Sequence, residues 1–239
     1  IFFYMKKKIA IFLAARSGSR RLPNKHFLNI NSKLRIIDLC ILRLKKAKLV
    51  NKIFLCTTKQ RNDLKFKEVC ETNNIKIFRG SANNVLKRFI DCAKENSIET
   101  IVRITADCPI IDPELIDKCI KLHFTKESDY TSNTFMRSFP DGLDVEIINL
   151  DTLLKSQKMN KTAFNKEHVS AFIRSSKIFK KNNYDNAVSY GNRRWTLDYL
   201  KDFYFLKKVI KHFSPKIYFS WKNIIKAEKK NKHLINIRN

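Results

Sequence analysis

Small and cationic residues crowd into one short segment of the sequence, residues 14–25. It reads AARSGSRRLPNK, and the apolar run at residues 9–15 is typical of a buried strand. A Gly/Ser-rich turn after a strand can aim successive backbone N–H groups at phosphate oxygens. Four cations beside Ser-Gly-Ser would repel one another without an anion, which favours a phosphate-binding loop over an ordinary solvated one. The segment matches neither the Walker pattern nor the dinucleotide fingerprint, which argues against kinases, GTPases and dehydrogenases.

Carboxylates follow two further β-rich runs. Asp107 comes directly after residues 100–105, and Asp198 comes directly after residues 194–197. If both runs are parallel strands of one sheet, their carboxyl ends meet at one crevice, where the two carboxylates could hold a hard cation such as Mg²⁺. Asp112 precedes a proline and is explained more simply as the cap of the next helix.

A fourth group of polar residues lies further along the chain. Asp144 and Glu146 alternate with apolar residues and so share one strand face, which suits either solvent or an amine or hydroxyl of a substrate. Asp141 stands in Pro-Asp-Gly, a common turn. His168 follows Glu167 without the Ser or Cys partner pattern of a catalytic triad.

The elements that must position these residues alternate along the chain. Short β-branched runs interleave with amphipathic stretches, which predicts βαβ units around a mostly parallel sheet. Strands are expected at 9–15, 52–58, 75–78, 100–105, 145–148 and 194–197, and helices at 34–47, 63–71, 84–94, 114–123, 152–158, 167–175, 201–213 and 221–230. We expect one domain over residues 5–239, the first four residues being set aside.

Residues of about 134–190 depart from this regular pattern and predict an excursion from the main sheet. Their apolar residues look exposed, and such a lobe is easiest to stabilise against a copy of itself, so a homodimer is expected. The residues concerned are Phe135, Phe139, Phe164, Phe172 and Ile173.

Composition narrows the class of protein. The net charge of +27 would suit a nucleic-acid partner, but the lysines are spread along the whole chain without a basic run or a recognition motif, so nucleic-acid binding is not expected as the main role. The six cysteines lack disulfide or zinc spacing and are expected to be reduced core residues. No segment has the length of a membrane span, and a soluble, cytoplasmic protein is expected.

Five motifs in order resemble the cytidylyltransferases that activate acylneuraminate and 3-deoxy-manno-octulosonate, in particular the spore-coat polysaccharide branch of that family. The resemblance runs from about residue 8 to 212. The motifs are the loop at 15–25, Gly80-Ser81 followed by VLKRF at 85–89, RITADCP at 103–109, PDGLDVE at 140–146 and EHV at 167–169.

The resemblance implies a nucleotide-diphospho-sugar-transferase-like α/β fold and CTP as the nucleotide donor. It places Arg16 and Lys25 on the phosphates, makes Asp107 a Mg²⁺ ligand with Asp198 in the position of a second one, and makes the excursion a dimerisation and acceptor-binding arm. The implied catalytic residues are Arg16, Lys25 and Asp107; the nucleotide site comprises Ala14, Ala15, Arg16, Ser17, Gly18, Ser19, Arg20, Lys25, Arg88, Thr105 and Ala106; the acceptor site comprises Asp141, Asp144, Glu146, Glu167 and His168.

The expected reaction is transfer of CMP from CTP to an acidic sugar of the nonulosonic or octulosonic type, or to a similar small acid, with release of pyrophosphate. A phosphonate acceptor or another nucleoside triphosphate is the alternative within enzymes. A basic RNA- or polyanion-binding protein without catalytic activity is the alternative from another class.

Overall fold

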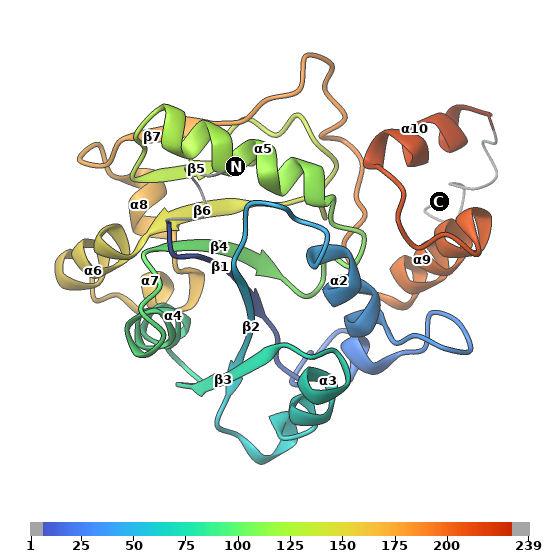
Figure 1. Cartoon of the computed structure of the whole chain (residues 1–239), viewed down its shortest axis with the longest axis horizontal. Helices are drawn as coiled ribbons and strands as arrows, with labels where there is room; N and C mark the ends of the chain where they lie inside the picture. The colour runs from blue at the N-terminus through green and yellow to red at the C-terminus, as the bar shows by residue number, and fades with distance from the viewer. Residues whose placement is uncertain (1–6, 231–239) are drawn as a thin grey trace.

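The computed structural model describes residues 7–230, which fold around one seven-stranded sheet with helices on both faces (Figure 1). The strand order is β3-β2-β1-β4-β6-β5-β7. The strands are β1 (Ile9–Ala14), β2 (Lys52–Thr58), β3 (Lys76–Gly80), β4 (Thr100–Thr105), β5 (Tyr130–Ser132), β6 (Glu146–Asn149) and β7 (Lys181–Asn183). The helices are η1 (Lys25–Phe27), α2 (Ile36–Leu44), η2 (Arg61–Asp63), α3 (Phe66–Thr72), α4 (Val85–Glu95), α5 (Pro113–Thr125), α6 (Leu150–Met159), α7 (Ala163–His168), α8 (Ala171–Ser175), α9 (Leu200–Phe213) and α10 (Trp221–Lys230). The predicted α/β fold with a mostly parallel sheet is confirmed.

The parallel half of the sheet, β3-β2-β1-β4, is covered on both faces. Alternate side chains of β1 point to opposite layers: Ile9 and Ile11 pack in the core that includes residues of α2 and α5, whereas Phe12 packs in the core that includes residues of α4. Burial on both faces explains why this strand reads as an unbroken apolar run. Because β1 and β4 are parallel neighbours, their carboxyl ends lie side by side, as the sequence predicts.

The second half of the sheet differs from the prediction. β6 lies between β4 and β5 and is antiparallel to both, and β7 pairs with β5. Residues 134–190 therefore return to the main sheet twice and are not wholly an excursion from it. β6 is the strand predicted at residues 145–148, whereas β5 and β7 are only three residues long and β7 reads Lys-Asn-Asn, so hydrophobic periodicity did not indicate these two.

The apolar residues of the same segment are also mostly buried within the chain. Phe139 and Ile173 are 3% and 0% exposed and belong to its own core, so their predicted exposure is wrong. Phe164 is 65% exposed, as predicted. The homodimer stays a prediction.

The strand predicted at residues 194–197 is absent. This segment makes one β-bridge, between Asp141 and Arg194, and the Leu197 amide donates to the Asp107 carbonyl at 2.8 Å. A single bridge is too little for a strand, but the hydrogen bond still brings Asp198 beside Asp107. The helix predicted at 167–175 is likewise two helices, α7 and α8.

Other expectations concern caps and cysteines. Asp112 accepts hydrogen bonds from the Glu114 and Trp221 amides at 2.9 Å, which confirms it as a helix cap. All six cysteines are buried and free, as expected of reduced core residues.

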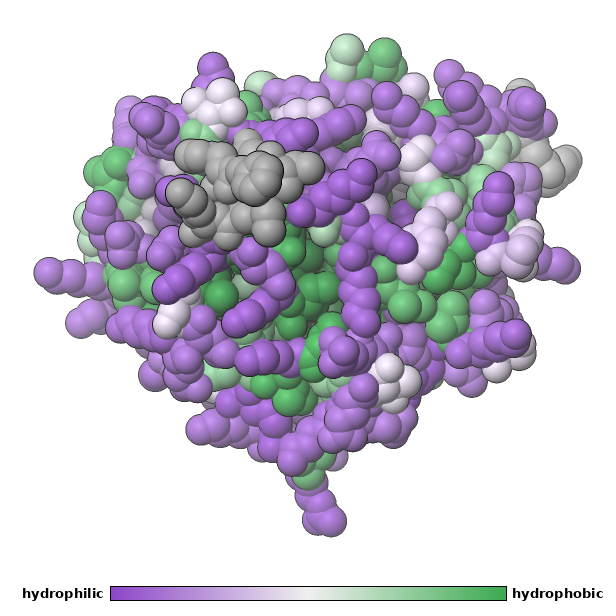
Figure 2. Space-filling model, viewed as in Figure 1, coloured by the Kyte–Doolittle hydropathy of each residue, from purple (hydrophilic) through white to green (hydrophobic). Residues whose placement is uncertain are grey.

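Hydrophilic side chains are spread over the face visible in Figure 2, with apolar ones between them. Within residues 7–230 no helix is long and apolar enough to cross a membrane. The ends of the predicted domain, residues 5–6 and 231–239, lie outside the described residues.

Candidate active site

A buried carboxylate holds the predicted phosphate loop in place. Asp63 is 1% exposed and accepts hydrogen bonds from Ser17 N at 2.8 Å and Ser17 Oγ at 2.6 Å, and it also contacts Thr58 Oγ1. Burial alone would raise the pKa of Asp63, but these hydrogen bonds lower it overall. The donors of Ser17 therefore face Asp63, and the loop is tied to the end of β2. The sequence analysis missed Asp63, although a carboxylate soon after a central strand was the signal used to find Asp107.

Lys25 stands at the centre of the site. It is 8% exposed, and its Nζ donates to the Leu197 carbonyl at 2.7 Å and to Asp198 Oδ1 at 3.0 Å. The same Nζ lies 3.7 Å from Asp107 Oδ2. Burial, and then the charge of Lys25, lower the pKa of the neighbouring His26 to about 4, so this ring is neutral at physiological pH. Lys25 thus joins the two predicted metal carboxylates.

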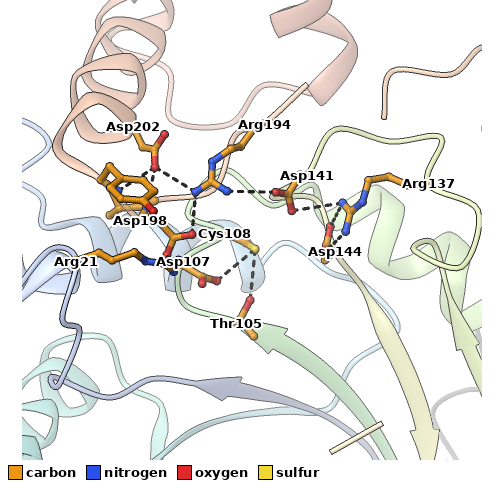
Figure 3. A network of polar contacts seen from close by, with 12 residues as sticks. Arg21, Thr105, Asp107, Cys108, Arg137, Asp141, Asp144, Arg194, Asp198 and Asp202 are labelled. Atoms are coloured by element: carbon orange, nitrogen blue, oxygen red, sulfur yellow. Dashed lines mark hydrogen bonds and ion pairs between the residues drawn. The ribbon is translucent and has the colours of Figure 1, made fainter. Parts of the chain in front are cut away.

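Asp198 accepts contacts from two further cations. It is 8% exposed, and Arg21 Nη2 and Arg194 Nη2 each lie 2.7 Å from one of its two oxygens. Burial alone would raise its pKa, but the hydrogen bonds from Arg194 and Lys25 lower it overall. Asp202 orders the same turn by accepting from the Asp198 amide at 2.9 Å, and it caps the first turn of helix α9. Figure 3 shows Arg194 between Asp198 and Asp141.

Asp107 is more open than Asp198 and suits a metal better. Its side chain is 32% exposed, and Lys25 is 3.7 Å away. Among residues 7–230, no three His, Cys, Asp or Glu side chains are grouped so that they could hold a metal ion. Mg²⁺ needs only one or two protein carboxylates when phosphate and water oxygens complete its octahedron. The donor set fits a metal that arrives with a triphosphate, and the metal role of Asp198 stays a prediction.

The two predicted acceptor residues near the turn are paired with arginines. Asp144 binds Arg137 through two hydrogen bonds of 2.7 and 2.8 Å (Figure 3). Asp141 lies 3.4 Å from Arg137 and 3.6 Å from Arg194. Burial, and then the charge of Asp144, raise the pKa of Asp141. Arg137 therefore links Asp144 to Asp141, and Arg194 links Asp141 to Asp198.

Glu146 and His168 meet at a separate pocket of about 560 Å³. Glu146 is 7% exposed, and its Oε1 lies 3.1 Å from Arg103 Nη1 and 3.9 Å from Arg174 Nη1. Glu167, the residue before His168, lies 3.9 Å from Arg16 of the phosphate loop. The residue next to one that lines the pocket therefore contacts the loop. Sequence reasoning missed Arg174, which lies in a segment without a recognisable motif.

Three further predicted nucleotide contacts have structural partners. Arg88 is 2% exposed and donates to the Ser81 carbonyl at 2.9 and 2.6 Å. Thr105 Oγ1 lies 3.4 Å from the Cys108 thiol, and the Ala106 amide donates to the Ala14 carbonyl at 3.0 Å. The last bond joins the ends of β1 and β4. The predicted roles of these residues at the nucleotide stay predictions.

Known proteins resemble this chain in sequence and fold. A family model described as cytidylyltransferase matches residues 10–231. The chain belongs to the cytidylyltransferase family. Because it belongs to this family, the protein is a CTP-dependent nucleotidyltransferase. A solved cytidylyltransferase of Leptospira borgpetersenii is 32% identical with a TM-score of 0.93, covering 98% of each chain.

Two other proteins extend the likeness. The spore coat polysaccharide biosynthesis protein SpsF of Bacillus subtilis is 30% identical over 172 residues, covering 70% of this chain and 70% of that protein. A CMP:2-keto-3-deoxy-manno-octonic acid synthetase solved with CTP is 12% identical with a TM-score of 0.64, covering 86% of this chain and 99% of that one. At that identity the second likeness shows the fold alone.

Proposed function

We propose that this cytidylyltransferase transfers CMP from CTP to a small acidic acceptor, an acidic sugar of the nonulosonic or octulosonic type being the first candidate, and releases pyrophosphate. The observation that carries the proposal is the position of Lys25, which lies within 4 Å of both Asp107, just after β4, and Asp198. Ligands of open α/β sheets bind outside the carboxyl ends of the strands, and the phosphate loop lies there. The likeness to a spore coat polysaccharide protein supports a sugar acceptor.

The reaction in this proposal is an in-line displacement without a covalent enzyme intermediate. An acceptor oxygen forms a bond to the α-phosphorus, the bond to the bridging oxygen breaks, and pyrophosphate carries the electron pair away. Positioning and charge neutralisation supply most of the rate. Arg16 lies on the exposed rim of the loop, so its side chain can turn from Glu167 to the triphosphate. Lys25 is buried and can donate to phosphate oxygens from inside the site.

Mg²⁺ belongs to the proposal as the ion that neutralises charge on the phosphates when it is bound. Asp107 would hold it, because this carboxylate is partly exposed and only loosely paired. Asp198 is the candidate second ligand, although it would have to loosen its 3.0 Å contact with Lys25 first.

The test is pyrophosphate release from each of the four nucleoside triphosphates, with and without Mg²⁺, against a panel of acidic sugars and phosphonates. We expect turnover with CTP in preference to UTP, ATP and GTP, and only in the presence of an acid acceptor. Equal turnover with all four nucleotides would contradict CTP specificity. Tight RNA binding without pyrophosphate release from any mixture would instead favour a binding protein.

A further inference from the structure

The pocket beside the phosphate loop has the size and lining of a small-molecule site. Its volume of about 560 Å³ lies in the range usual for such sites. Arg103, Glu146 and Arg174 supply charged groups, while Phe135 and Phe164 supply apolar surface. Phe164 remains 65% exposed and leaves an apolar rim on which the carbon skeleton of a ligand could lie.

The charges of this pocket do not cancel. Glu146 is buried and directs Oε1 to Arg103 at 3.1 Å, so these two groups neutralise each other. Arg174 lies 3.9 Å from the same oxygen, a long contact that leaves its positive charge poorly matched. One guanidinium charge is therefore available to an anion.

Arg174 is also held ready for a ligand. Nη1 donates to Thr134 Oγ1 at 2.8 Å, Nη2 donates to the Thr134 carbonyl at 3.3 Å, and the guanidinium lies over the Phe135 ring at 4.9 Å. These contacts fix the orientation of the guanidinium. Because a guanidinium has five N–H donors, some of them remain available to a ligand. Its side chain is 34% exposed, so a ligand can reach it. A planar, fixed donor fork suits an acid group with two adjacent oxygens.

A strained turn shapes another part of the pocket wall. Val169 has φ 53° and ψ −61°, and the Ser170 amide donates to the His168 carbonyl at 2.5 Å. This is a γ-turn with positive φ, a costly conformation for a β-branched residue. Val169 is 0% exposed, so core packing holds it there. The turn separates α7 from α8 and places His168 and Ser170, its two flanking residues, on the lining of one pocket.

We infer that this pocket holds the acceptor and that Arg174 binds the acceptor's acid group, a carboxylate or a phosphonate. The inference rests on the proposed function, because the pocket is called an acceptor site only in relation to CTP. The contact between Arg16 and Glu167, the residue before His168, brings the phosphate loop to this part of the chain. Arg174 is thereby a specificity-determining residue for an acid rather than a neutral sugar.

The test separates binding from catalysis. Saturation-transfer NMR on the full chain, in about 0.15 M salt to screen loose surface attraction, compares lactate, hydroxymethylphosphonate and the neutral lactamide. We expect signal from at least one of the two acids and none from lactamide. Arg174→Gln should reduce that signal about tenfold or more, since a charged two-point contact is lost. Whichever acid responds identifies the acid group. Lactamide binding as strongly as the acids, or no acid binding at all, would overturn the inference.

Matched variants guard against trivial outcomes. Lys177→Gln removes one positive charge from an exposed position just beyond α8 and should keep the signal. Arg174→Lys keeps the charge but not the fork, and should lose most of the signal if two-point binding is right. Melting temperatures show which variants are folded.

Kinetics provide the second readout. Arg174→Gln should raise the KM for the acceptor and leave the KM for CTP within about twofold, because uniform binding of one substrate is lost. An equal rise in both KM values would contradict the assignment. If no mixture releases pyrophosphate, the proposed function fails, while the lactate experiment still decides whether Arg174 binds an acid.

Discussion

Two charged clusters, one around Lys25 and one in the pocket of Glu146, pair their groups in opposite ways. Around Lys25, the carboxylate of Asp198 is surrounded by cations, with Lys25, Arg21 and Arg194 all within 3.0 Å. In the neighbouring pocket the single carboxylate of Glu146 is matched by Arg103, and Arg174 is left with spare donors. The first cluster holds its lysine in a fixed place, whereas the second leaves a cation free for a ligand. Charge is therefore used for positioning on one side and for recognition on the other.

The largest effect is expected at Asp107, which belongs to the first cluster yet is only loosely bound in it. Asp107→Asn keeps the shape and removes the one partly exposed carboxylate beside Lys25. Activity should fall about 100-fold or more, in line with losses of charge stabilisation in other enzymes. The melting temperature should stay level or rise, because the lost ion pair is a long one of 3.7 Å. Turnover and thermal unfolding of the purified variant check both statements. A destabilised but fully active variant would refute the site assignment.

Compared with Asp107→Asn, substitution of Asp198 is expected to cause a smaller loss of activity and a larger loss of stability. Asp198→Asn removes the negative charge that three cations contact and replaces one accepting oxygen with an NH2 donor, so the unfolding free energy should fall by about 1–3 kcal/mol. Lys25 would lose its anchor, so the KM for CTP should rise. Denaturant unfolding and CTP kinetics, run beside Asp107→Asn, show whether the two carboxylates differ in this way. Unchanged stability would mean that Asp198 does not position the cations.

The sequence predicted the first cluster better than the second for a physical reason. Strands buried on both faces give long apolar runs, so β1 and β4 and the residues that follow them were readable. Lys25 and Asp107 could thus be assigned to one crevice. In the pocket, the alternating pattern predicted β6 with Glu146, but the turn at Val169 leaves no periodic signal. Arg174 lies beyond that turn in α8 and outside the EHV motif of residues 167–169.

Asp198 lies beside Asp107 as predicted, but the reason for the prediction was wrong. The sequence predicts a strand before it, yet the chain there makes a single bridge, and the hydrogen bond from the Leu197 amide to Asp107 brings the two acids together. Arg21 and Arg194 belong to segments singled out in the sequence, but long side chains can reach many partners. Spacing alone could not tell that both converge on one carboxylate.

The smallest effect is expected where the two clusters meet, at the ion pair between Arg16 and Glu167. Its atoms are 3.9 Å apart and the side chains are 60% and 58% exposed, so water and salt screen the attraction and the two flexible chains lose entropy by pairing. Glu167→Gln should therefore change the unfolding free energy by less than about 0.5 kcal/mol. The pair nevertheless competes with CTP for Arg16, so removing the carboxylate should lower the KM for CTP, by about threefold at most at low salt. The gain should vanish at about 1 M salt, where the screening length is roughly 3 Å. Asp185→Asn, a loss of the same charge at another exposed position, serves as the control and should leave the KM for CTP unchanged. A rise in the KM for CTP in Glu167→Gln would mean that Glu167 holds Arg16 in its working position instead of competing for it.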